Sequence, residues 1–115
     1  MSEDDALYLA EMVEAADKIE SYIAGLDEET FLRSQMVADA VALNLLVLGE
    51  AANRASAGLR TMDDSFPWAD LAGLRNRIAH GYAHVDQRIV WQILTSDLPG
   101  LRSRLTRLQE LLKDR

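Results

Sequence analysis

The chain has 115 residues, a hydrophobic fraction of 49% and a net charge of −7, which suits one folded domain with its own core. The absence of cysteine excludes a disulfide framework and a thiolate metal site, and two histidines are too few for a dedicated zinc site. Residues 2–5 are acidic, unlike a signal peptide, and no continuous apolar run reaches the roughly 18 residues that cross a bilayer. We therefore expect a cytoplasmic protein.

Charge is unevenly divided between the two halves of the chain. Residues 1–50 hold 12 acidic and 2 basic residues, whereas residues 51–115 hold 7 acidic and 10 basic residues. This asymmetry is consistent with a local surface in the second half that attracts phosphate. An acidic surface that only maintains solubility explains the first half equally well.

The first element in the chain is an amphipathic helix, predicted over residues 4–24. Apolar residues recur there at helical spacing with acids between them. Gly25 is a plausible helix stop. Asp27 then caps a second start, which predicts a short separate helix, and Ser34 caps the helix after it.

Residues 35–57 are the most hydrophobic segment, with apolar side chains nearly all around the expected helix. Such a helix is buried on most sides, which in so small a domain suggests contact with a second copy as well as with the core. Asp39 and Glu50 interrupt it about three turns apart, on one face. We expect one of them to pair with Arg75; an ordinary Glu50–Arg54 pair within the helix is the alternative.

Residues 58–66 are expected to be a connector, and Pro67 opens a helix over residues 68–80. One arc of that helix is apolar and should face the core: Trp68, Leu71, Leu74 and Ile78. Asn76 and His80 lie four residues apart on the opposite side. Arg75 falls inside the apolar arc, so it needs a carboxylate partner or an anionic ligand.

Residues 81–85 are predicted to form a turn, and Asp86 to cap the last helix. Pro99 should kink or restart that helix, with Ser96 or Asp97 as the cap. A leucine stripe continues to the end, and we expect Arg102, Arg104 and Arg107 beside it to be solvated. Because no strand pattern is visible, the fold class is all-α.

The segment from Leu74 to Tyr82 holds the densest group of side chains that could bind a ligand or take part in catalysis. The guanidinium groups of Arg75 and Arg77 suit phosphate, and Asn76 both donates and accepts hydrogen bonds. The imidazole of His80 can titrate near neutral pH. Tyr82 adds a hydroxyl just past Gly81, so the segment is the candidate site.

The spacing Arg-x4-His-x-Tyr, here Arg75, His80 and Tyr82, resembles the signature of HEPN domains of the HepT type. The resemblance covers nearly the whole chain, as a single domain over residues 1–115, through Leu7-Tyr8-Leu9, Gly49-Glu50-Ala51-Ala52, Pro67-Trp68, Val85-Asp86, Ile89-Val90-Trp91 and Asp97-Leu98-Pro99. It implies a homodimeric up-and-down bundle of four to five helices.

The resemblance also implies an activity and partners. HepT-type proteins are toxins whose antitoxin is a minimal nucleotidyltransferase, and HEPN ribonucleases cut RNA without a metal or other cofactor in a cleft built from two protomers. The tyrosine of the motif, here Tyr82, would accept AMP from the antitoxin. A bulky anionic adduct two residues from His80 would repel RNA.

Metal-free RNA cleavage by the 2′-hydroxyl needs a base, an acid and a cation near the phosphate. We assign His80 to proton transfer, Arg75 to charge stabilisation and Asn76 to positioning the phosphate or His80. Arg77 would contact RNA or solvent, and Glu50 or Asp39 would support Arg75. One motif supplies one imidazole, so a symmetric dimer would bring two copies to a shared groove.

Several of these residues could instead have a purely structural role. His80 could simply interact with the dipole at a helix end, and Tyr82 could hydrogen-bond within the site. His84 departs from the family pattern, which has a small residue nearby; it could assist catalysis or only occupy the turn. The competing function is a catalytically silent module that binds a nucleotide or a protein.

Overall fold

The computed structural model describes residues 4–114, so Ser2 and Glu3 of the acidic start lie outside the described part. The domain measures 45 × 29 × 20 Å. Every element in residues 4–114 is helical: α1 (Asp5–Ile23), α2 (Glu28–Leu32), α3 (Gln35–Arg54), α4 (Ala57–Met62), α5 (Trp68–Gly81), the 3₁₀ turn η1 (Tyr82–His84), α6 (Gln87–Gln92), the π turn η2 (Ile93–Asp97) and α7 (Leu98–Lys113). The predicted all-α class is confirmed.

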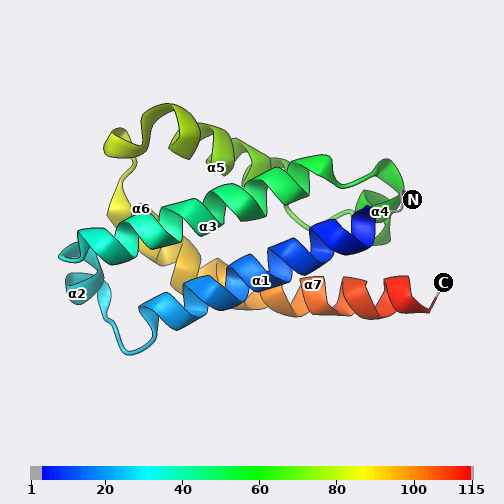
Figure 1. Cartoon of the computed structure of the whole chain (residues 1–115), viewed down its shortest axis with the longest axis horizontal. Helices are drawn as coiled ribbons and strands as arrows, with labels where there is room; N and C mark the ends of the chain where they lie inside the picture. The colour runs from blue at the N-terminus through cyan, green and yellow to red at the C-terminus, as the bar shows by residue number, and fades with distance from the viewer. Residues whose placement is uncertain (1–3, 115) are drawn as a thin grey trace.

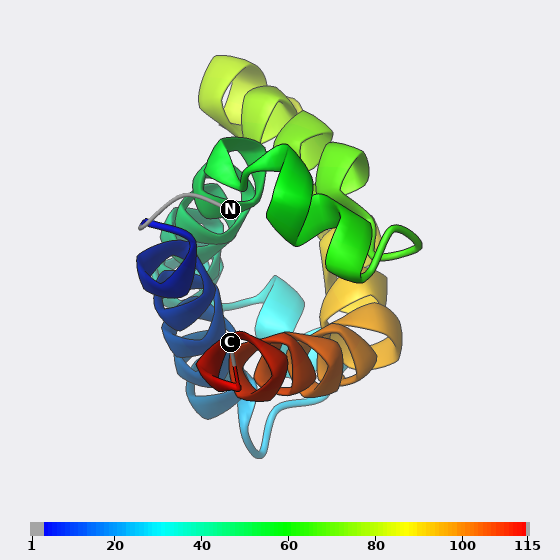
Figure 2. The ribbon, with the colours of Figure 1, turned by 90° about the vertical axis from the view of Figure 1, so that its right-hand side faces the viewer.

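The long helices α1, α3, α5 and α7 alternate in direction along the long axis, as an up-and-down bundle requires (Figure 1). Viewed from the end, they surround a common core, with α6 and η2 closing the side between α5 and α7 (Figure 2). Helix α3 packs between α1 and α5. The long elements match the expected four to five helices, and α2 and α4 are short additions.

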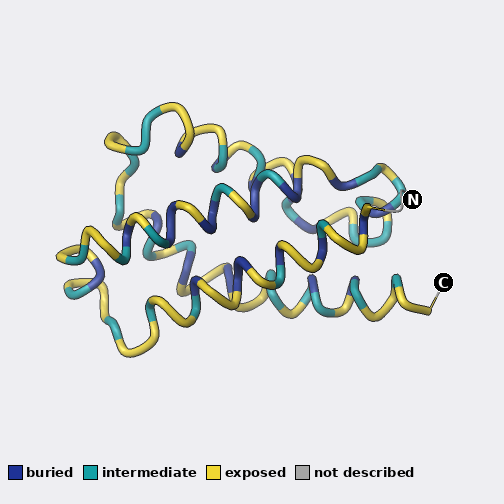
Figure 3. Tube along the Cα trace, viewed as in Figure 1, coloured by how far each residue is buried: buried dark blue, intermediate teal, exposed yellow. Residues whose placement is uncertain are grey.

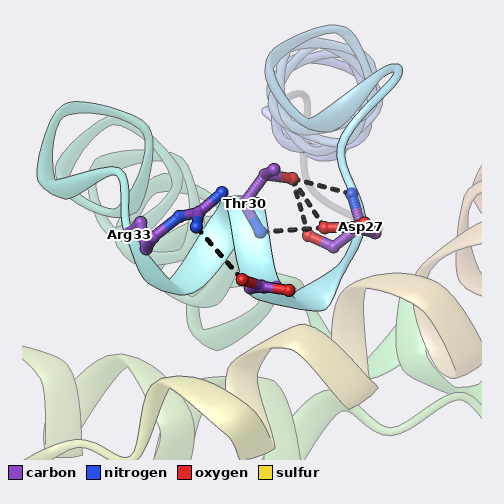
Figure 4. A network of polar contacts seen from close by, with 4 residues as sticks. Asp27, Thr30 and Arg33 are labelled. Carbon is purple, nitrogen blue, oxygen red and sulfur yellow. Dashed lines mark hydrogen bonds and ion pairs between the residues drawn. The ribbon is translucent and has the colours of Figure 1, made fainter.

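The reversal between α1 and α3 follows from local chemistry that the sequence predicts. Gly25 has φ +79°, the left-handed conformation in which glycine avoids a side-chain clash. Asp27 and Thr30 then form a reciprocal capping box: the Thr30 amide donates to Asp27 Oδ1 at 2.8 Å, and the Asp27 amide donates to Thr30 Oγ1 at 2.9 Å (Figure 4). The short helix α2 therefore begins where predicted.

The segment after α3 differs from the prediction. Residues 58–66 are not simply a connector, because α4 occupies Ala57–Met62, and α3 ends at Arg54. Ser56 caps α4 by accepting from the Leu59 amide at 3.1 Å. The fully buried Asp5 carboxylate accepts from the Ser56 amide at 3.1 Å and from its hydroxyl at 2.6 Å. Asp5 thus ties the start of α1 to α4, and Leu59 is buried beneath.

The core forms where the helices face one another, and the exposed positions lie on the outside (Figure 3). The predicted arc of α5 is confirmed, since Trp68, Leu71, Leu74 and Ile78 are all buried. Helix α3 is long and apolar enough to cross a membrane by length and composition, with a hydropathy of 1.4. Half of that stretch is buried inside the domain, as in a core helix.

The C-terminal helix restarts near Pro99, as predicted. The π turn of η2 ends at Asp97, and α7 begins at Leu98 with Pro99 in its first turn, where a missing amide donor costs little. Asp97 occupies the cap position, but its side chain makes no capping bond. The π turn η2 therefore leads directly into α7 without a side-chain cap.

The arginines of α7 correct a second prediction. Arg104 is only partly exposed, and its Nε donates to Asp63 at 2.9 Å. Arg102 forms an ion pair with Asp17 of α1. Only Arg107 remains as an exposed cation among the three. Two of them therefore fasten α7 to neighbouring segments, since each meets a carboxylate distant in the chain.

Candidate functional site

The site begins with the close contact of α3 and α5. A β-carbon at Gly49 would lie only 2.6 Å from the Leu71 carbonyl oxygen and would collide with the β-carbon of Arg75. Only glycine at this position of α3 lets the α5 backbone approach so closely. The approach puts the next residue, Glu50, directly beside Arg75.

Glu50 holds two arginines at once. Its Oε2 lies 3.2 Å from Arg75 Nε, and its Oε1 lies 3.0 Å from Arg54 Nε. The predicted Glu50–Arg75 pair and its alternative, Glu50–Arg54, are therefore both present. Arg75 Nη1 also donates to the Asn76 side-chain oxygen at 2.9 Å. Two contacts orient the Arg75 guanidinium, which keeps 36% of its side chain exposed.

Asp39 does not pair with Arg75, which corrects the other half of that prediction. It lies three turns earlier on α3, and there it meets the far end of α5. Its Oδ1 accepts from the Tyr82 hydroxyl at 3.2 Å and from Gln35 Nε2 at 2.7 Å. Burial raises the pKa of the Tyr82 phenol, and the hydrogen bond to Asp39 raises it further, because a negative neighbour disfavours phenolate.

His80 is exposed on the last turn of α5, opposite the buried arc. Within residues 4–114 its imidazole has no hydrogen-bond or ion-pair partner, which leaves both nitrogens open to a ligand. It borders a cavity of about 500 Å³ lined by Leu74, Arg77, His80, Gly81, His84, Val85, Asp86, Ile89, Val90 and Ile93. The imidazole is therefore accessible to a molecule bound there.

Arg75 borders a different cavity. That cavity, of about 530 Å³, lies between α1, α3 and α5 and is lined by Glu11, Glu14, Ala15, Lys18, Asn44, Leu46, Val47, Glu50, Arg54, Arg75 and Ala79. Five positions along a helix rotate a side chain by about 140°, which separates Arg75 from His80 around α5. One protomer therefore places the two motif residues on different sides of the helix.

The remaining motif residues lie near Arg75 or near the His80 cavity. Asn76 is exposed and contacts Arg75 rather than His80. Arg77 is exposed and borders both the His80 cavity and a neighbouring one, which also share Leu74 and Ile93. The two cavities thus lie next to each other along α5. His84, whose role the motif left undecided, lines the His80 cavity; its spacing of four from His80 was the available signal.

Comparison with known proteins agrees with this architecture. The family profile described as Ribonuclease HepT-like matches residues 12–108. A protein named probable ribonuclease HepT, from Thermococcus cleftensis, is 28% identical over 103 residues, which cover 90% of this chain and 94% of that protein. No solved structure matches the chain significantly.

Two further relatives carry provisional RNase names. One, from Methanocaldococcus jannaschii, is 27% identical over 102 residues, covering 89% of this chain and 94% of its own length. The other, from Caldanaerobacter subterraneus, is 24% identical over 98 residues, covering 85% and 88%. Because the family profile spans well over half of its residues, the chain belongs to the HepT-like ribonuclease family.

Proposed function

We propose that the protein is a metal-independent endoribonuclease toxin that cleaves RNA by attack of the 2′-hydroxyl on the adjacent phosphorus. The observation that carries this proposal is the exposed imidazole of His80, which has no partner among residues 4–114, on the same helix as an arginine oriented by Glu50. Membership of the HepT-like family supports the reaction class. In this reaction the 2′-oxygen forms a bond to phosphorus and the bond to the 5′-oxygen breaks.

Each motif residue has a role in that reaction. His80 transfers a proton, either from the 2′-hydroxyl or to the leaving 5′-oxygen. Arg75 stabilises the charge that develops on the phosphoryl oxygens, for which its planar fork is suited. Asn76 positions Arg75 through the 2.9 Å hydrogen bond between them. Arg77, exposed beside the His80 cavity, contacts the RNA backbone.

A homodimer is part of the proposal, because the Arg75 and His80 cavities of one protomer are separate. Helix α3 exposes an apolar stripe beside the Arg75 cavity: Met36 is 79% exposed, Leu43 61% and Val47 37%. These residues follow one another at helical spacing, and Val47 also lines the cavity. Burying the stripe against a second chain would place that chain beside the Arg75 cavity, and we propose that it presents its His80 there.

The proposed antitoxin is a minimal nucleotidyltransferase that modifies Tyr82. The Tyr82 oxygen would attack the α-phosphorus of ATP, pyrophosphate would leave, and the phenol would lose its proton. The hydroxyl is the group that now donates to Asp39, so AMP transfer would also break that hydrogen bond. The bulky phosphodiester would then stand two residues from His80 and repel RNA.

A catalytically silent binding module is the second candidate, and the net charge of −7 favours it, because RNA-binding surfaces are ordinarily basic. The cavity beside His80, with its apolar floor, suits a nucleotide in either case. The two functions differ in whether a bound RNA is cut.

One assay separates them. A short RNA is incubated in EDTA with the wild-type protein, with His80→Ala or with Arg75→Ala, and the products are resolved on a gel. We expect wild-type cleavage to a 2′,3′-cyclic phosphate and a loss of at least about 100-fold in each variant. Equal cleavage by all three proteins would remove these assignments, and RNA binding without any cleavage would favour the module.

A further inference from the structure

The cavity beside His80 is bordered by both imidazoles of the chain. His80 lies on the last turn of α5 and His84 at the end of η1, four residues later. A β-carbon at Gly81 would lie 3.9 Å from His84 Cδ2, so the His84 ring folds back over the residue next to His80. Within residues 4–114, neither imidazole has a hydrogen-bond or ion-pair partner. Both rings are therefore available to the same ligand.

The rest of the cavity combines a cation with an apolar floor. Arg77 from α5 and Asp86 from the loop before α6 are the other charged residues that line it. The Asp86 carboxylate is already engaged, since it accepts from the Arg88 amide at 2.9 Å to cap α6. The floor is built from Leu74, Val90 and the partly exposed Ile89 and Ile93, which suits a ribose and base with their phosphate at the charged rim.

RNA cleavage by a 2′-hydroxyl requires two proton transfers, and this cavity holds two groups able to make them. We propose that His84 is the second proton-transfer residue of the site, which rests on the proposed nuclease function. One imidazole takes the proton of the 2′-hydroxyl as the bond from the 2′-oxygen to phosphorus forms. The other, as imidazolium, gives its proton to the 5′-oxygen as its bond to phosphorus breaks.

This assignment changes what each protomer contributes. The pair of imidazoles comes from one chain, and the partner chain supplies Arg75, whose own cavity lies on the other side of α5. The two imidazoles then bracket a phosphate whose ribose lies on the apolar floor. Arg77, between the two linked cavities, contacts the next phosphate of the strand.

The test is single-turnover cleavage of a short RNA in EDTA from pH 5 to pH 9. The proteins compared are wild type, His80→Ala, His84→Ala and, as the matched control, Arg107→Ala, an exposed residue of α7 outside these cavities. We expect a bell-shaped profile for wild type and the control. His84→Ala should be slower by about 10²- to 10⁴-fold and should lose one limb of the bell.

Two further measurements separate chemistry from folding and binding. His84→Ala should bind an uncleavable RNA, carrying a 2′-deoxyribose at the cut, within about threefold of the wild-type affinity. An RNA with sulfur in place of the leaving 5′-oxygen needs no acid, so it should restore cleavage to only one of the two histidine variants. Restoration of both variants, or of neither, would contradict the division of roles.

The results of these assays test the role of His84 separately from the proposed nuclease activity. Cleavage by wild type that is lost in His80→Ala but retained in His84→Ala would leave the nuclease in place and overturn the role of His84. Wild-type protein that binds RNA without cutting it would overturn both proposals. Unchanged circular dichroism and melting temperature in His84→Ala are expected, because the side chain is exposed.

Discussion

Gly49 and Arg75 are in such close contact that a β-carbon on the glycine would collide with the β-carbon of the arginine. The two residues lie on α3 and α5, and their contact sets the separation of these helices. Because Glu50 follows Gly49 directly, the same contact brings its carboxylate to Arg75. The orientation of the proposed catalytic arginine therefore depends on the absence of a side chain at Gly49.

Gly49→Ala tests this relationship. The added methyl group meets the Leu71 carbonyl at 2.6 Å, so α5 must shift, and overpacking of this kind costs about 1–3 kcal/mol. Urea unfolding should show the loss, and RNA cleavage should fall because Arg75 moves away from Glu50. The matched control is Gly73→Ala, where nothing lies within 4 Å and an added methyl group should stabilise the helix. Equal stability of the two variants would contradict the close approach.

Asp39→Asn should change the titration of Tyr82. The hydrogen bond and negative charge of Asp39 contribute to the raised pKa of this phenol, and burial, the largest cause, remains in the variant. The pKa should therefore fall part of the way toward its ordinary value of 10.0. Phenolate absorbance against pH measures it, with Tyr82→Phe in each background to subtract the other tyrosines. No change would mean that the contact does not persist in solution.

The Asp63–Arg104 pair should make stability sensitive to acid. The hydrogen bond from Arg104 holds the pKa of Asp63 below its ordinary value of 3.8, despite the opposing effect of burial. A lowered folded-state pKa adds stability above about pH 4, which is lost as the pH falls through the folded-state value. Asp63→Asn should remove this contribution, and urea unfolding should show a larger difference from wild type at pH 7 than at pH 2.5.

The size of that difference should be modest. The side chains of Asp63 and Arg104 are 22% and 35% exposed, so solvent screens the pair and about 1 kcal/mol or less is expected. The neighbouring exposed residue provides the control, since Asp64→Asn should leave the pH dependence of unfolding unchanged. A similar effect of both substitutions would point to general charge rather than to this contact.

Leu43→Glu tests the proposed dimer. This side chain is 61% exposed in the middle of the apolar stripe of α3, so a charge there should disrupt an interface without disturbing the core. Sedimentation should show dimers for wild type and monomers for the variant, and cleavage should fall with dimer content. Leu7→Glu on α1, with 55% exposure, is the matched control and should remain dimeric. Wild-type monomers that cleave RNA would refute the dimer.

Local signals made much of the fold predictable. Gly25, Asp27 and Ser34 act within a few residues of themselves, so the end of α1 and the starts of α2 and α3 follow from the sequence. The arc of α5 follows from helical spacing. Helix α4 was not predicted, because its stability comes from Leu59 in the core and from the Asp5–Ser56 contact across 51 residues.

The residues that form the site could be predicted from the sequence, but the way they are arranged in space could not. The pairing of Glu50 with Arg75 was foreseen because a half-buried arginine needs a carboxylate. The hydrogen bond between Asp39 and Tyr82 could not be predicted, because it depends on how far α3 and α5 run side by side. Nor could spacing alone show that Arg75 and His80 border separate cavities, which depends on the helices packed on each side of α5.

The most direct measurement of the central claim is complementation between two inactive variants. Arg75→Ala and His80→Ala chains, carrying different affinity tags, are purified as a mixed dimer and assayed on RNA in EDTA. If one protomer supplies the guanidinium and its partner the imidazole, the mixed dimer holds one intact composite site and should cleave RNA, while each variant alone should not. A mixed dimer as inactive as its parents would contradict the composite site.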